Sequence, residues 1–169
     1  QRFLDYGAAG IQVPHVESDE DVRRLAEWAS YPPLGNRGQV FGLGNTGFRA
    51  VDRDEYVAAA NDEVLLIPMI ETRRGVEEVD EILDAGGANA VFIGTGDLSS
   101  SYGVPGQMTH PIVLEAAERV VAACRARGIA AAINAEEPEW ARYWIERGVS
   151  MVAYSSDVGM LRRQATALL

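Results

Sequence analysis

The chain has 169 residues, of which 47% are hydrophobic and 24% are charged, as in an ordinary globular domain. Its formal net charge is −10, from 15 basic and 25 acidic residues. Because nucleic acids and anionic membranes are bound through clustered positive charge, neither is expected as a partner. No apolar run approaches the roughly 20 residues that a membrane-spanning helix needs.

Five short apolar runs alternate with amphipathic stretches along the chain. Nearly continuous apolar runs of this length are typical of strands buried on both faces of a parallel sheet. The predicted strands are, in chain order, Gly10–Pro14, Val64–Ile70, Ala90–Ile93, Ile129–Asn134 and Ser150–Tyr154. The predicted helices are Asp19–Ser30, Asp52–Asn61, Thr72–Ala85, Pro111–Arg127, Pro138–Arg147 and Ser156–Leu169.

Several of these helices carry end signals. Ser18 precedes acidic residues, as expected for an N-cap. Pro111 stands at a helix start, where its missing N–H costs nothing. Gly128 and Gly148 each follow a basic residue, which is typical of helix C-termini.

The repeated strand–helix alternation predicts an α/β fold with a parallel sheet and right-handed crossovers. Five such units make either an open doubly wound sheet or part of a TIM (β/α)8 barrel of about 250 residues. No low-complexity tract or linker divides residues 1–169, so we expect one domain. The single cysteine, Cys124, excludes an intrachain disulfide, favours a cytoplasmic location, and is expected in the core.

Two acidic residues follow consecutive predicted strands. Glu71 comes directly after the second strand, and Asp97 lies four residues beyond the third. Neighbouring strands are about 4.8 Å apart, so the two carboxylates can reach one cation. Two carboxylates with water in the other positions suit Mg²⁺ or Mn²⁺. Alternatively, each acid serves only as a helix cap or first-turn residue.

Other candidates surround this pair. The turn Gly94-Thr95-Gly96 allows close backbone approach to a carboxylate or phosphate, or is simply a tight turn. His15, after the first strand, could orient substrate or transfer protons, or could be packed structurally. Arg37, in a loop rich in Gly and Pro, could bind an anion bidentately or could pin the loop.

Two aromatic residues, Trp140 and Trp144, are four residues apart on one predicted helix face. They suit either the core or a subunit contact, with the contact slightly favoured. His110, next to Pro111, is expected to be a helix cap.

Several motifs resemble the HpcH/HpaI aldolase family of class II pyruvate aldolases, close to 2,4-dihydroxyhept-2-enedioate and 2-dehydro-3-deoxyglucarate aldolases. The resemblance runs through the whole chain. The motifs are, in order, Asp5-Tyr6-Gly7-Ala8, Val13-Pro14-His15-Val16, Tyr31–Gly38, Ile70-Glu71-Thr72-Arg73 and Phe92–Ser99. The resemblance implies a TIM barrel seen from its fourth to its eighth strand, the C-terminal two-thirds. The family's catalytic His and carbonyl-stabilising Arg would lie on earlier strands.

The resemblance also implies an activity. Glu71 and Asp97 would bind Mg²⁺, Mn²⁺ or Co²⁺, which chelates a pyruvate-like or oxaloacetate-like 2-oxo acid and stabilises its enolate. The enzyme would be a lyase that cleaves or forms 4-hydroxy-2-oxo acids with an aldehyde as partner. Substrate contacts are expected from Gly94, Thr95, Gly96, Asp97, His15 and Arg37, and a homo-oligomer, trimer or hexamer, is expected.

Three positions depart from the family pattern. Met69 stands where these aldolases carry Gln, Thr95-Gly96 replaces Pro-Ala, and His15 replaces Met. Three alternatives stay open besides the aldolase. They are an acyl-CoA lyase of the citramalyl- or malyl-CoA type, a non-catalytic protein that binds metal and 2-oxo acid, and a phosphate-binding barrel that uses the glycine turn.

Overall fold

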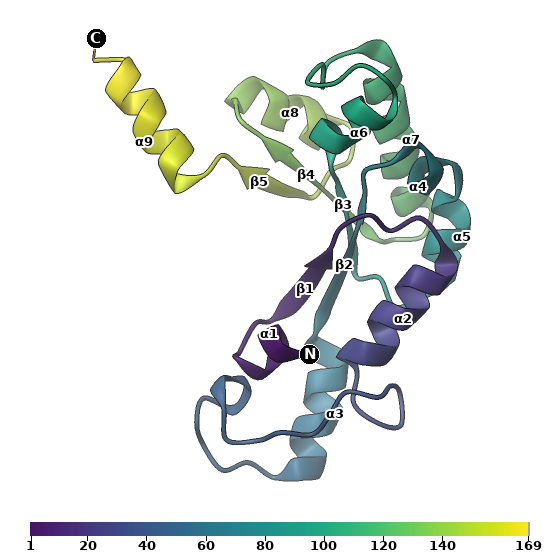
Figure 1. The fold of residues 1–169 in the computed structure, drawn as a ribbon, viewed down its shortest axis with the longest axis vertical. Coiled ribbons are helices and arrows are strands. Elements are labelled where there is room, and N and C mark those ends of the chain that lie inside the picture. Colours follow the sequence, from purple (N-terminus) through teal and green to yellow (C-terminus); the bar gives the residue numbers. More distant parts are fainter. Residues whose placement is uncertain (169) are drawn as a thin grey trace.

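A computed structural model describes residues 1–168 as a five-stranded parallel sheet with helices against it (Figure 1). All five predicted strands are confirmed to within one residue at each end. The strands are β1 (Gly10–Val13), β2 (Leu65–Ile70), β3 (Ala90–Ile93), β4 (Ala130–Ala135) and β5 (Met151–Tyr154).

The order of the strands distinguishes the two architectures that the sequence left open. The sheet runs β1-β2-β3-β4-β5, and every neighbouring pair is parallel. A doubly wound sheet reverses its strand order at a switch point, whereas a barrel adds each strand beside the last. The chain therefore forms an arc of a barrel.

Most helix predictions are also confirmed. The helices are α1 (Arg2–Asp5), α2 (Asp19–Ala29), α3 (Arg53–Glu63), α4 (Arg73–Glu77), α5 (Val79–Asp84), α6 (Thr95–Ser101), α7 (Pro111–Ala126), α8 (Pro138–Glu146) and α9 (Asp157–Thr166), with a short 3-10 turn η1 (Gly44–Thr46). The helix predicted over 72–85 is two helices, because the backbone of Glu78 (φ −91°, ψ 11°) departs from helical geometry. Leu169, which was included in the last predicted helix, lies outside the described residues. Within residues 1–168, no helix has the length and apolar character to cross a membrane.

The predicted helix ends are confirmed by hydrogen bonds and backbone angles. The hydroxyl of Ser18 accepts from the N–H of Asp21 at 3.3 Å. The ring of His110 caps α7 by accepting from the N–H of Ile112 at 3.4 Å. Gly128 and Gly148 have φ angles of +68° and +103°, which glycine adopts without strain.

The core lies between the sheet and α7, α5 and α8. It includes Ile93 and Ile133 of the sheet, packed with Cys124 of α7. Burial raises the pKa of the Cys124 thiol to about 11, so the thiol stays protonated at neutral pH. Trp144 is buried in the same cluster and Trp140 packs at its margin, so the preference for a subunit contact was wrong for Trp144.

Burial is uneven along the sheet. Every residue of β3 is buried, as predicted, whereas three of the four residues of β5 are exposed. The prediction of burial on both faces was therefore wrong for β5, and also for β1, in which no residue is buried; these two strands are the edges of the sheet in the described residues. The terminal helix α9 has no buried residue and extends away from the other helices (Figure 1).

Candidate metal and substrate site

Glu71 lies at the carboxyl end of β2 and is buried, with only 2% of its surface exposed. The chain turns away immediately after it, because Thr72 caps α4 by accepting from the N–H of Gly75 at 3.0 Å. Side chains alternate along a strand, so Glu71 shares the concave face of the sheet with Met69, whereas Ile70 packs into the helix-facing core. Local structure thus fixes the position of this carboxylate.

Gly94 makes room for the Glu71 side chain. The register pairs Ile70 with Ile93, which brings the next residues, Glu71 and Gly94, side by side. A Cβ on Gly94 would lie 2.6 Å from Oε2 and 2.8 Å from Cβ of Glu71, so any larger residue would force Glu71 to move. The sequence predicted that glycine here would let a ligand approach, but the close approach is made by the protein's own carboxylate.

Asp97 lies in the first turn of α6, a helix that the sequence prediction treated as a turn. Its side chain is exposed, unlike that of Glu71. Beside it, a Cβ on Gly96 would meet no atom within 4 Å, so the space in front of this backbone is open. The two predicted metal ligands therefore follow adjacent strands, Glu71 directly after β2 and Asp97 in the helix after β3, one buried and one exposed.

Ser99 stabilises the turn that carries Asp97. Its hydroxyl donates to the carbonyl of Gly96 at 2.6 Å and accepts from the N–H of Gly106 at 2.9 Å. The side chain is fully buried. The sequence showed Ser99 only as part of a motif, and this positioning role depends on a loop that folds back from seven residues away.

The carboxylate pair suits a hard divalent cation. In the described part of the chain, neither Glu71 nor Asp97 forms an ion pair with an arginine. Oε1 of Glu71 has His15 as its neighbour, but no arginine balances the buried charge, and a bound cation would offset the cost of burying it. No group of three or more His, Cys, Asp or Glu converges among residues 1–168. Two carboxylates would leave the other coordination positions to water and substrate, which is common for Mg²⁺.

His15 is brought against Glu71, as its place after the first strand suggested. Its backbone N–H donates to Oε1 of Glu71 at 2.8 Å, and its Nδ1 lies 3.6 Å from the same oxygen. The residue has a positive φ of 53°, a conformation uncommon for a residue other than glycine. The ring is largely exposed, so it is accessible to a ligand bound at Glu71.

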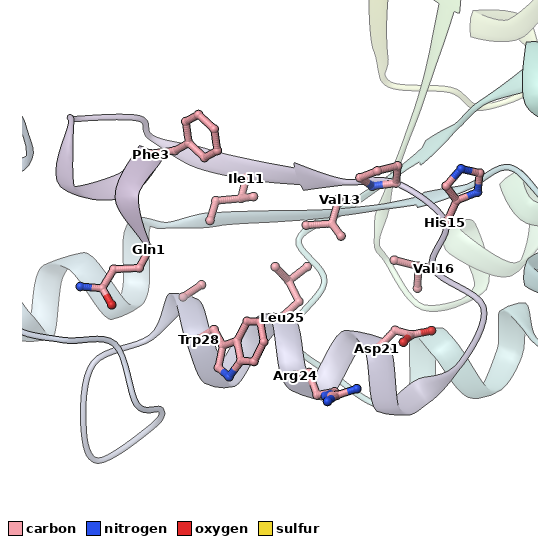
Figure 2. A pocket seen from close by; sticks show the side chains of 12 residues that line it. Gln1, Phe3, Ile11, Val13, His15, Val16, Asp21, Arg24, Leu25 and Trp28 are labelled. Atoms are coloured by element: carbon pink, nitrogen blue, oxygen red, sulfur yellow. The ribbon is translucent and has the colours of Figure 1, made fainter.

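A groove of about 430 Å³ runs beside β1, between this strand and α2 (Figure 2). Ile11, Val13 and Leu25 give it an apolar lining, and His15 lies at one end. The groove follows the edge of β1 that pairs with no strand in the described chain. It is therefore a feature of the open sheet edge, and it meets the carboxylate site only at His15.

Arg37 is not brought to this site, in contrast to the prediction that it contacts substrate. Its guanidinium is buried, lies 3.0 Å from the carboxylate of Asp5 and stacks 4.3 Å from the ring centroid of Tyr31. Asp5 precedes β1, so this pair lies toward the amino end of the sheet, opposite to Glu71. Arg37 pins its loop, and we do not retain it among the substrate-binding residues.

Nearly the whole chain matches one protein family. A family model described as HpcH/HpaI aldolase/citrate lyase covers residues 1–164. The chain belongs to this family. It is 37% identical over 98% of its length to a 2-keto-3-deoxy-L-rhamnonate aldolase of Klebsiella pneumoniae. It is also 37% identical, over its full length, to a hydroxypyruvate/pyruvate aldolase of Roseovarius nubinhibens.

Solved structures agree with this assignment. An HpcH/HpaI aldolase from Desulfitobacterium hafniense superposes with a TM-score of 0.92 at 36% identity, over 98% of this chain and 64% of that one. The chain spans 61% and 65% of the lengths of the two named sequence relatives. The relatives therefore contain additional chain beyond the region that this HpcH/HpaI chain matches.

Proposed function

We propose that this HpcH/HpaI chain belongs to a divalent-metal-dependent aldolase that cleaves or forms 4-hydroxy-2-oxo acids. The observation that carries the proposal is the buried Glu71 carboxylate, which pairs with no arginine among the described residues and lies against Gly94 at the start of the helix with Asp97. The names of the relatives, a 2-keto-3-deoxy-L-rhamnonate aldolase and a hydroxypyruvate/pyruvate aldolase, support it. The substrates would be a pyruvate-like or oxaloacetate-like 2-oxo acid and an aldehyde.

Glu71 and Asp97 would hold the cation, which we expect to be Mg²⁺, Mn²⁺ or Co²⁺. When bound, the cation would act as a Lewis acid toward the carbonyl of the 2-oxo acid. All 15 basic residues of the chain are arginines. None of these 169 residues can therefore form the Schiff base by which a lysine would activate the same carbonyl.

The neighbouring residues would bind and orient the 2-oxo acid. Its carboxylate would accept hydrogen bonds from the backbone N–H groups of Gly96 and Asp97, where the open space at Gly96 gives access. Gly94 and Thr95 shape this backbone, and Thr95 is buried. His15 would contact the substrate with its exposed ring, while its N–H fixes one oxygen of Glu71.

We further propose how the chain sits in the whole enzyme. Its five strands would be strands four to eight of an eight-stranded barrel, and residues 1–169 would form one partial domain. The remaining length of the relatives supports this arrangement. A cytoplasmic homo-oligomer, trimer or hexamer, would cover α9 and the residues just after it, where Val158, Leu161 and Leu168 are between 68% and 80% exposed.

The proposal is tested by a retro-aldol assay on the purified full-length protein. Candidate 4-hydroxy-2-oxo acids are supplied, and the pyruvate released is detected by a coupled reduction. We expect turnover to stop after chelation and to return when Mg²⁺, Mn²⁺ or Co²⁺ is restored. Turnover that persists without metal would contradict the mechanism. Citramalyl-CoA serves as the control substrate, and its preferential cleavage would favour the acyl-CoA lyase alternative.

A further inference from the structure

Gln12 is a polar side chain on the concave face of β1. Its neighbours Ile11 and Val13 line the groove on the side of α2 (Figure 2), and Gln12 does not. Because successive side chains of a strand point to opposite faces, Gln12 points to the face that also carries Met69 and Glu71. Its Nε2 lies 2.9 Å from the sulfur of Met69, to which it donates a hydrogen bond.

This contact brings the amide of Gln12 close to the carboxylate site. The register pairs Gln12 with Ile67, so the side chain reaches along β2 toward its carboxyl end to contact Met69. Met69 and Glu71 are consecutive on the concave face. The amide therefore lies beside Met69, the side chain that precedes Glu71 on the concave face of the sheet, and so on the inner side of the proposed site.

The amide is held only weakly. A thioether is a poor hydrogen-bond acceptor, whereas a glutamine amide has two donor hydrogens and a carbonyl oxygen that accepts. Some structural amides elsewhere in the chain use both ends. The side chain of Asn61, for example, accepts from the N–H of Tyr31 and donates to its carbonyl. Gln12 is exposed and its described side-chain bond is to sulfur alone, so it is free to bind a polar ligand.

The side chains next to Gln12 in β2 and β3 do not offer such a group. Ile67 and Met69 occupy the same face of β2, and Phe92 lies opposite Met69 on β3. An oxygen atom bound on the inner side of Glu71 would therefore find a hydrogen-bond partner in Gln12, in addition to any contact with the ring of His15 after the end of β1. We propose that Gln12 is a positioning residue whose amide binds a water molecule or an oxygen of the 2-oxo acid beside Glu71. This inference rests on the proposed function. The amide would come from Gln12 on β1, and not from the position of Met69 on β2.

The experiment measures pyruvate binding to the Mn²⁺-loaded full-length protein by calorimetry, alongside kcat and KM. We expect Gln12→Leu to weaken pyruvate binding about tenfold, because a hydrogen bond to a charged ligand is lost. The double variant Gln12→Leu/Met69→Gln returns an amide to the same face from β2, and we expect it to recover most of the affinity. Ile11→Ala, on the groove side of β1, controls for general damage to the strand and should leave pyruvate binding unchanged.

The outcomes separate this inference from the proposed function. Unchanged pyruvate binding in Gln12→Leu, with intact Mn²⁺ binding that depends on Glu71, would overturn only the role of Gln12. Equal losses in Gln12→Leu and Ile11→Ala would also overturn it, since strand damage would then explain both. A wild-type protein that binds no Mn²⁺ would overturn the proposed function and this inference together.

Discussion

The centre and the edges of the sheet differ in how completely they are packed. β3 is buried along its whole length between its neighbouring strands and α7, whereas β5 is mostly exposed and β1 borders an open groove. Glu71 and Asp97 follow the two strands β2 and β3, at or next to the packed centre. The proposed ligands are therefore carried by well-packed strands, while His15 and α9 belong to the parts that still have uncovered surface.

The contrast has a physical consequence for function. A site held on rigid strands keeps its geometry, because the surrounding core resists movement of the backbone. The open edges are suited to contacts with further chain or another subunit, since exposed apolar side chains gain from burial. Substitutions in the packed centre and at the open edges of the sheet should therefore have different effects, and the largest is expected where a buried charge loses its partner.

The largest effect is expected at the buried ion pair near the β1 edge. Arg37→Met would leave Asp5 buried without its cation, and we expect a loss of about 3–5 kcal/mol in the free energy of unfolding. Arg23→Met is the matched control, because its pair with Asp19 is exposed and should contribute little. Urea denaturation measures both. Equal effects would show that the edge is not held by this pair.

Two valines compare the strands directly. Val91 of β3 is fully buried, so Val91→Ala should lower the free energy of unfolding by about 2 kcal/mol. Val152 of β5 is only partly buried, and Val152→Ala should cost less than about 1 kcal/mol. Denaturation midpoints of the two variants test the difference. A larger loss at Val152 would mean that β5 is the better packed strand in solution.

Two glycines compare positions within the site. Gly94→Ala would place a methyl group 2.6 Å from Oε2 of Glu71, which must move. We expect Mn²⁺ affinity to fall at least about tenfold, or about 1.4 kcal/mol. Gly96→Ala adds its methyl group to open space and touches no protein atom, so Mn²⁺ affinity should stay the same. The methyl group would occupy the space in which the substrate carboxylate is proposed to bind, so KM for the 2-oxo acid should rise. Calorimetry and steady-state kinetics distinguish the two.

The sequence predicted the strands well because apolar runs and end signals are local properties. It also predicted that Glu71 and Asp97 follow neighbouring strands. The uneven burial of β3 and β5 could not be predicted, since an apolar run does not reveal whether covering elements are present. Nor could the pairing of Arg37 with Asp5, because the partners are 32 residues apart and meet only through the fold.

Two features of the site also required the structure. The reason why position 94 requires a small residue depends on the register between β2 and β3, which places Gly94 beside Glu71. Gln12 was not among the site residues predicted from the sequence, although it is the single amide in an otherwise apolar strand and could have been noticed for that reason. α6 was missed because Gly94-Thr95-Gly96 has the composition of a turn, while the helix begins within it.

The central claim is that Glu71 and Asp97 bind one cation together. The most direct test is a titration of the full-length protein with Mn²⁺, followed by electron paramagnetic resonance, in the wild type and in Glu71→Gln and Asp97→Asn. We expect one tight Mn²⁺ per chain in the wild type and loss of that site in each variant, with the fold preserved by circular dichroism. Wild-type Mn²⁺ binding in either variant would contradict the shared site.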